Sequence, residues 1–123
     1  MTSQEKDILK VRLGLAIQMK VEENKLIAQK NKEKGIDNHL VIDSLRKLES
    51  SSGIPYAAIH LTVSGTKNAS FTTLWAIAEG LGIKLDDFFA NYYYKVPDSE
   101  VNKKLKEKSK PKKAVKKKTA KKK

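Results

Sequence analysis

Few side chains in this 123-residue chain could do chemistry, and their spacing builds no catalytic or metal site. His39 and His60 are the only histidines, and neither has another His, a Cys or a close pair of acids at metal-ligand spacing. Asp86 and Asp87 fit the solvated start of a short helix, where acids favour the positive end of the dipole. The serines at 50–52 have no base at a recognisable position. We therefore expect no enzyme, no catalytic residue, no metal, no cofactor and no small-molecule substrate.

Lysine is the one charged residue type that gathers in a single part of the chain. Residues 101–123 hold 13 lysines and one acid and carry +12, whereas residues 1–100 hold 13 basic and 13 acidic residues. Self-repulsion and the lack of apolar surface predict a disordered tail. Such an arm binds polyanions by releasing their counterions; a charge run that only aids solubility is the alternative. Nonspecific phosphate binding is expected from Lys112, Lys113, Lys116, Lys117, Lys118, Lys121, Lys122 and Lys123.

The composition argues against disulfides and membrane spans. The chain contains no cysteine. Its longest apolar stretch, around residues 13–19, is interrupted by Gly14 and Gln18 and is far too short to cross a bilayer. Residues 2–12 are charged, which does not fit a secretion signal. We expect a cytoplasmic, nucleoid-associated protein that does not contact a membrane.

A long amphipathic helix is predicted at the start of the chain. It should run from about residue 7 to near residue 28, because side chains on one stripe recur close to every 3.6 residues. Packing against the rest of the core is the expected role of this broad face, and contact with a second copy of the chain is the alternative. A polar loop with Gly35 should follow over residues 31–38. The stripe comprises Ile8, Val11, Leu15, Met19, Glu22 and Leu26, widened by Leu9, Leu13 and Ile17.

Two short helices around a tight turn are predicted next. The first begins at Asp37 or at Ser44, since either can supply an N-cap oxygen, and it must end by Gly53. Pro55 opens the second helix, because proline suits a first helical turn, and Gly65 follows its end. A glycine between two short apolar helices is typical of a helix-turn-helix, which presents its second helix to the major groove of DNA.

Two further helices are predicted before the tail. Ser70 should cap a helix that ends in the Gly80 to Gly82 region, and residues 85–90 should form another. Trp75 is expected to pack in the core. The tyrosines at 92–94 are expected to seal one end of that core rather than to stack on bases.

Residues 44–89 carry a resemblance to a known family. The segment SLRKLESSSGIPYAAIHLTVSGTKNASFTTLWAIAEGLGIKLDDFF resembles the Cro and phage-repressor type of helix-turn-helix domain, the xenobiotic-response-element-like family of bacterial transcriptional regulators. The matching features are the Leu45 to Leu48 helix, Ser52-Gly53-Ile54 at the turn, Ile59, Gly65, the approach Lys67-Asn68-Ala69-Ser70, and Leu74 to Phe89 as the final helical pair. The link over residues 31–43 is longer than in the family.

The resemblance implies an all-α, lambda-repressor-like fold, a compact bundle of about five helices, and the charge pattern predicts a disordered basic tail after it. Residues 1–36 form the N-terminal amphipathic helix and loop. Residues 37–95 form the helix-turn-helix DNA-binding region, packed with the first helix as one domain. Residues 96–123 form the lysine-rich tail.

The resemblance also implies which residues meet double-stranded DNA. Base edges would be met by Pro55, Tyr56, Ala57, His60 and Leu61, and phosphates by Ser44, Ser64, Thr66, Lys67 and Asn68. The second helix of the motif offers no Arg, Gln or Asn, the side chains that make bidentate contacts with bases. We therefore expect weak direct readout and an A/T-leaning or shape-based preference.

Three functions are compatible with the sequence. The first is a DNA-binding transcriptional regulator, aided by the tail and acting as a homodimer on two-fold symmetric sites. The second is an architectural, nucleoid-type packaging protein in which the tail dominates binding. The third is an antitoxin-like module that binds a protein through the apolar face of the first helix.

Overall fold

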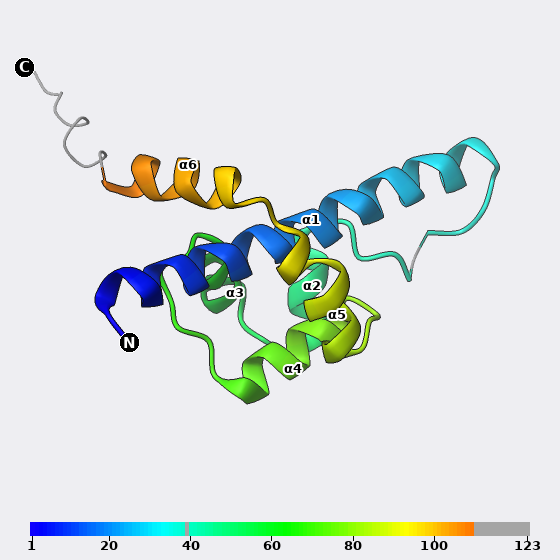
Figure 1. The fold of residues 1–123 in the computed structure, drawn as a ribbon. Helices are drawn as coiled ribbons and strands as arrows, with labels where there is room; N and C mark the ends of the chain where they lie inside the picture. The colour runs from blue at the N-terminus through cyan, green and yellow to red at the C-terminus, as the bar shows by residue number, and fades with distance from the viewer. Residues whose placement is uncertain (39, 110–123) are drawn as a thin grey trace, which may run out of the picture.

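The computed structural model describes residues 1–38 and 40–109, and every regular element in those residues is helical. The order is α1 (Ser3–Glu33), α2 (Leu45–Ser52), α3 (Tyr56–Val63), α4 (Phe71–Gly80), α5 (Leu85–Asn91), the 3₁₀ turn η1 (Tyr93–Lys95) and α6 (Asp98–Ser109). Helix α1 crosses the whole molecule, with α2 to α5 on one side of it and α6 on the other (Figure 1). The all-α prediction is confirmed for the described residues.

Helix α1 begins before the predicted residue 7 because of a capping box. The Thr2 hydroxyl accepts a hydrogen bond from the Glu5 backbone N–H, and the Glu5 carboxylate accepts one from the Thr2 N–H. Its last turns extend beyond the other helices, and the chain returns along them through residues 34–38 and 40–44 (Figure 1). Asn24 and Asn38 hold this return by donating to the backbone oxygens of Ile42 and Ala28.

The buried face of α1 matches the predicted stripe only in part, since Val11, Leu13 and Ile17 of that stripe are buried. Its centre includes Gly14 and Asn24, while Leu26 is 61% exposed and Leu15 and Met19 are half-buried. A Cβ on Gly14 would lie 2.1 Å from the Val63 backbone oxygen, so α3 crosses α1 at this glycine. The spacing of large apolar residues could not predict the whole of this face, because α3 approaches α1 at Gly14, which has no side chain.

The ends of the short helices lie where local chemistry predicts them. Ser44, not Asp37, is the N-cap of α2, because its hydroxyl accepts from the Lys47 N–H at 3.1 Å. Gly53 ends α2 in the left-handed conformation, with φ of 77°. Ser70 caps α4 in the same way as Ser44, accepting from the Thr73 N–H.

One core joins the first five helices. Ile17, Leu48, Ile59, Ile77 and Phe88, one from each of α1 to α5, are all at most 2% exposed. They belong to a single cluster of packed apolar side chains. Helix α1 and residues 45–91 therefore share one hydrophobic interior.

Order continues past the predicted end of the folded region. The sequence pattern predicts a disordered tail from residue 96, but residues 98–109 form α6, which packs on α1. Val101 is 2% exposed and Leu105 packs against the same core. These two apolar residues are four positions apart and give α6 one buried stripe. The lysine-rich composition of the segment predicted disorder because it takes no account of this spacing.

Two aromatic predictions have different outcomes. Trp75 does not pack in the core, since it is 50% exposed. Of the three consecutive tyrosines, Tyr93 is buried, Tyr92 is half-buried and Tyr94 is 73% exposed, so only the first two help to close the core.

Candidate nucleic-acid interface

Helices α2 and α3 form a rigid pair around a three-residue connection. Leu48 and Ile59, both 0% exposed, pack their facing sides into the core. The Ser52 hydroxyl accepts from the Ile54 N–H at 3.1 Å within the turn. The Glu49 carboxylate accepts from the Tyr56 N–H at 3.1 Å, so a side chain of α2 satisfies the first N–H of α3. These bonds fix the angle at which α3 leaves the turn.

Helix α3 has one buried and one solvent-facing side. Ile59 and Thr62 are both 0% exposed, and the Thr62 hydroxyl donates to the Ala58 backbone oxygen at 2.8 Å. That bond lets a polar side chain occupy a core position without an unsatisfied group. Of the residues predicted to meet base edges, Pro55, Ala57, His60 and Leu61 are exposed and Tyr56 is half-buried.

An arginine absent from the predicted set lies against this surface. The Arg46 guanidinium carbon is 3.8 Å from the centroid of the Tyr56 ring, close enough for a cation–π contact. The Tyr56 and His60 ring centroids are 6.1 Å apart, and Arg46 Nη1 is 3.8 Å from a Glu49 carboxylate oxygen. Arg46, Tyr56 and His60 therefore form a continuous row from α2 onto the exposed side of α3. We call this the Arg46–His60 row.

The local sequence gives no direct signal for the role of Arg46. It is separated from Tyr56 by ten positions, and only the packing of α2 on α3 brings the two together. Arg46 is one of two arginines in the chain, and its side chain is 73% exposed. The other, Arg12, donates to the Val96 backbone oxygen and pairs with Asp98, so it holds the start of α6.

The predicted phosphate-facing residues lie at the two ends of the helix pair. Ser44 starts α2, with its hydroxyl oxygen already accepting from the Lys47 N–H. Ser64 donates to the Leu61 backbone oxygen, and its hydroxyl is 2.9 Å from that of Thr66. Thr66, Lys67 and Asn68 are exposed in the loop after α3. The predicted tail lysines from Lys112 to Lys123 lie outside the described residues.

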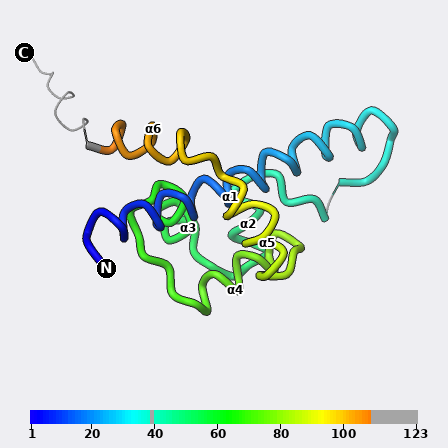
Figure 2. Tube along the Cα trace, in the orientation of Figure 1, coloured from blue at the N-terminus to red at the C-terminus, as the bar shows by residue number. Residues whose placement is uncertain are grey.

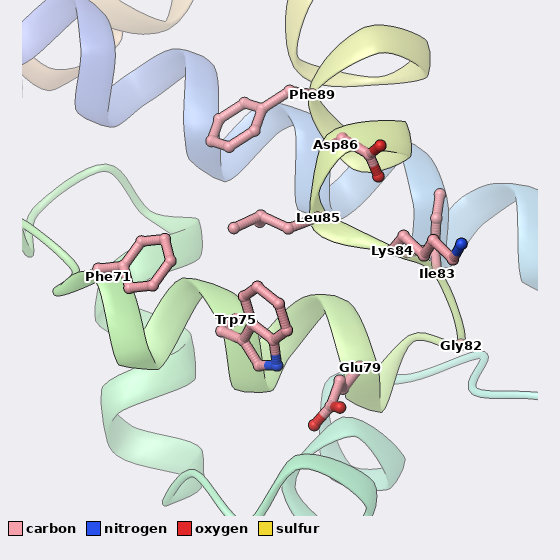
Figure 3. A pocket seen from close by; sticks show the side chains of 9 residues that line it. All are labelled: Phe71, Trp75, Glu79, Gly82, Ile83, Lys84, Leu85, Asp86 and Phe89. Carbon is pink, nitrogen blue, oxygen red and sulfur yellow. The ribbon is translucent and has the colours of Figure 1, made fainter.

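A second surface is an apolar groove between α4 and α5. Phe71 and Trp75 of α4 face Leu85 and Phe89 of α5 across an open space of about 800 Å³ (Figure 3). Phe71 is 66% exposed and Trp75 is 50% exposed, so this small protein leaves two large apolar side chains in contact with solvent. Glu79, Lys84 and Asp86 also line the groove and bring both signs of charge to it.

Three of the four clear pKa shifts among the described residues fall in one cluster away from both surfaces, and burial raises the pKa of the fourth group, Tyr93. Hydrogen bonds from Tyr92 and Lys20 hold the pKa of Glu23 below its usual value. Burial and the bond to Glu23 raise the pKa of Tyr92. Burial lowers the pKa of Lys20, but its contacts with Glu23 and Tyr92 outweigh burial and raise it overall. This cluster joins α1 to the residue that ends α5.

The chain matches no family model, no curated protein and no solved structure. Within residues 1–38 and 40–109, no three His, Cys, Asp or Glu side chains gather as a metal site. Helix α1 is long enough to cross a bilayer, but neither it nor any other described helix is apolar enough.

Proposed function

We propose that the protein is a DNA-binding transcriptional regulator of the Cro and phage-repressor helix-turn-helix type, with α3 as the helix that enters the major groove. The observation that carries the proposal is the Arg46–His60 row on the exposed side of a helix whose other side is locked into the core. A rigid, solvent-facing helix behind a tight turn is the form in which such domains present side chains to base edges.

The row also changes what this surface offers to DNA. Residues on α3 itself provide a phenol and an imidazole for hydrogen bonding, and Ala57 and Leu61 for contact with thymine methyl groups. Arg46 adds a guanidinium at the edge of that face, from a helix that would lie across the phosphate backbone. The proposal therefore assigns Arg46 to phosphate, and Tyr56, His60 and Leu61 to bases.

The test is selection of duplexes from a random pool by the full chain. We expect enrichment of a short motif that His60→Ala alters or abolishes. Thr72→Ala, on an exposed residue of α4 away from α3, is the matched control and should enrich the wild-type motif. Strong binding with no enrichment would overturn the regulator and favour the architectural protein, in which lysines dominate.

We further propose that two copies associate through the groove between α4 and α5. The face of α1 expected to meet a second copy is partly covered in the monomer: Leu15 and Met19 are half-buried, while Leu26 is 61% exposed. The groove is lined by exposed aromatic side chains, by the cation Lys84 and by the acids Glu79 and Asp86. Two copies related by a two-fold axis can therefore pair opposite charges.

We expect Trp75→Lys to convert a dimer to a monomer in sedimentation equilibrium, while Tyr94→Lys leaves the dimer unchanged. A monomeric wild type at high concentration would refute this.

A further inference from the structure

The loop after α3 is held between the two outer helices of the molecule. The Lys108 ammonium of α6 donates to the Gly65 backbone oxygen at 2.7 Å. Gly65 also lies against Val11 of α1, because a Cβ at this glycine would come within 2.9 Å of a Val11 methyl carbon. Asn68, three residues further, lines a shallow pocket together with Lys6 of α1.

Helix α6 reaches this loop in a fixed direction. Arg12 holds its start through the Val96 oxygen and the Asp98 carboxylate. Val101 is buried against the core in its first half, and Lys108 bonds to the loop near its end. Figure 2 shows α6 running alongside the first half of α1, back toward the N-terminal end of the chain.

Three elements thus bring lysines to the loop after α3. Lys6 comes from α1, Lys67 from the loop itself and Lys108 from α6. An ammonium group has three N–H donors, so Lys108 keeps two after bonding Gly65. Lys10 lines the same pocket as Lys6 but lies 3.5 Å from the Asp7 carboxylate, so part of its charge is already offset.

We infer that Lys6, Lys67 and Lys108 form a phosphate-binding surface for the DNA backbone that flanks the groove entered by α3, and that α6 delivers the start of the lysine-rich segment to the same backbone. The inference rests on the proposed function. Its physical basis is that ammonium groups around the loop after the proposed groove-binding helix release counterions from one short run of phosphates. Residues 110–123, which hold nine lysines, follow directly from α6.

The first test compares two triple variants with the same loss of charge. One changes Lys6, Lys67 and Lys108 to Gln, and the control changes Lys30, Lys32 and Lys34, exposed residues at the end of α1 and its C-cap, to Gln. With about 0.9 in log K per log salt for each phosphate, the first should lower the salt slope of duplex binding by about 2 to 3. The control should leave it nearly unchanged. An equal decrease in both variants would show that only total charge matters and would overturn the surface.

The second test locates α6 on the DNA. The chain has no cysteine, so Glu107→Cys accepts a single DNA-cleaving reagent, and Ile27→Cys on the distant part of α1 is the control. We expect cuts from position 107 in the backbone beside the selected site and none from position 27. Scattered cuts from 107 on a duplex that the protein does select would refute delivery by α6.

These outcomes separate the inference from the proposed function. If the wild type selects no site, the regulator fails, but the two triple variants can still be compared on random duplexes. A slope that falls only in the Lys6, Lys67 and Lys108 variant would then support the surface without the regulator.

Discussion

The contact between Arg46 and Tyr56 gives the proposed DNA-binding face its only guanidinium. An exposed cation–π contact is worth about 0.5–1 kcal/mol, so it orients the arginine without contributing much to folding. Its value lies in preorganisation, because the guanidinium plane is held over the ring before any ligand arrives. The same contact limits the rotamers of Tyr56 at the start of α3.

Replacing Arg46 should weaken binding to all duplexes alike. We expect Arg46→Ala to lower the salt slope by about 1 and to reduce affinity to a similar degree on selected and unrelated sequences, as for a phosphate contact. Arg46→Lys is the control: it keeps the charge but loses the flat group that stacks on Tyr56. A change in the selected motif with Arg46→Ala would instead assign the arginine to a base.

The Glu23, Tyr92 and Lys20 cluster makes stability depend on acid pH. Glu23 has a lowered pKa, so the folded state binds its proton less readily than the unfolded chain does. Its contribution is full above the ordinary pKa of glutamate and is lost as pH falls through the lowered value. We expect Tyr92→Phe to lose less stability than the wild type between about pH 5 and pH 3. The measurement is urea unfolding across this range.

A matched tyrosine controls this prediction. Tyr94 is 73% exposed and makes no described contact with Glu23, so Tyr94→Phe should follow the wild-type curve. The Glu23 side chain is itself 48% exposed, and the effect should therefore be small, well under the value of a buried ion pair. Identical acid limbs for all three proteins would show that the cluster does not contribute.

At the scale of elements, α1 and α3 cross more closely than a side chain at Gly14 would allow. Gly14 allows the α3 backbone to approach so closely that a methyl group would overlap the Val63 oxygen. We expect Gly14→Ala to destabilise the protein by about 2–3 kcal/mol despite the higher helix propensity of alanine, because the helices must separate. Thermal unfolding measures this.

The control for Gly14 is an exposed position on the same helix. Gln18→Ala changes a solvent-facing residue of α1 and should alter the unfolding free energy by no more than about 0.5 kcal/mol. A Gly14→Ala protein as stable as the wild type would mean that α1 and α3 can shift apart at no cost. The side of α3 that we propose for base contact would then be less firmly held than the structure indicates.

Local chemistry was enough to predict both ends of α2 and the start of α4, but not the bounds of α1 or the buried faces. Ser44, Gly53 and Ser70 act through their own backbone neighbours, so their roles follow from sequence. The buried side of α1 depends on which partner approaches Gly14, and α6 depends on a core that accepts Val101. For the candidate site, sequence located exposed residues on α3 but missed Arg46, whose role exists only after α2 packs on α3.

At the scale of the whole molecule, the basic segment begins before the described folded region ends. The positive excess begins at residue 101 in sequence, whereas the structure describes a docked helix up to Ser109. Helix α6 therefore belongs to the folded body while carrying the first lysines of the basic segment. Most lysines of the basic segment can therefore be removed without removing any described helix, provided that the truncation leaves α6 intact.

Two truncations make this separation measurable. Ending the chain after Ser109 removes nine lysines and no described contact, so the unfolding free energy should stay within about 0.5 kcal/mol of the full chain. If the removed segment engages about six phosphates, the salt slope of duplex binding should fall by about 5.

Ending the chain after Pro97 also removes the buried Val101 and the Lys108 bond to Gly65, and should destabilise the fold by at least about 2 kcal/mol. Equal stability of both truncated chains would show that α6 is not part of the folded body, and its proposed delivery of the lysine-rich segment to DNA would fall with it.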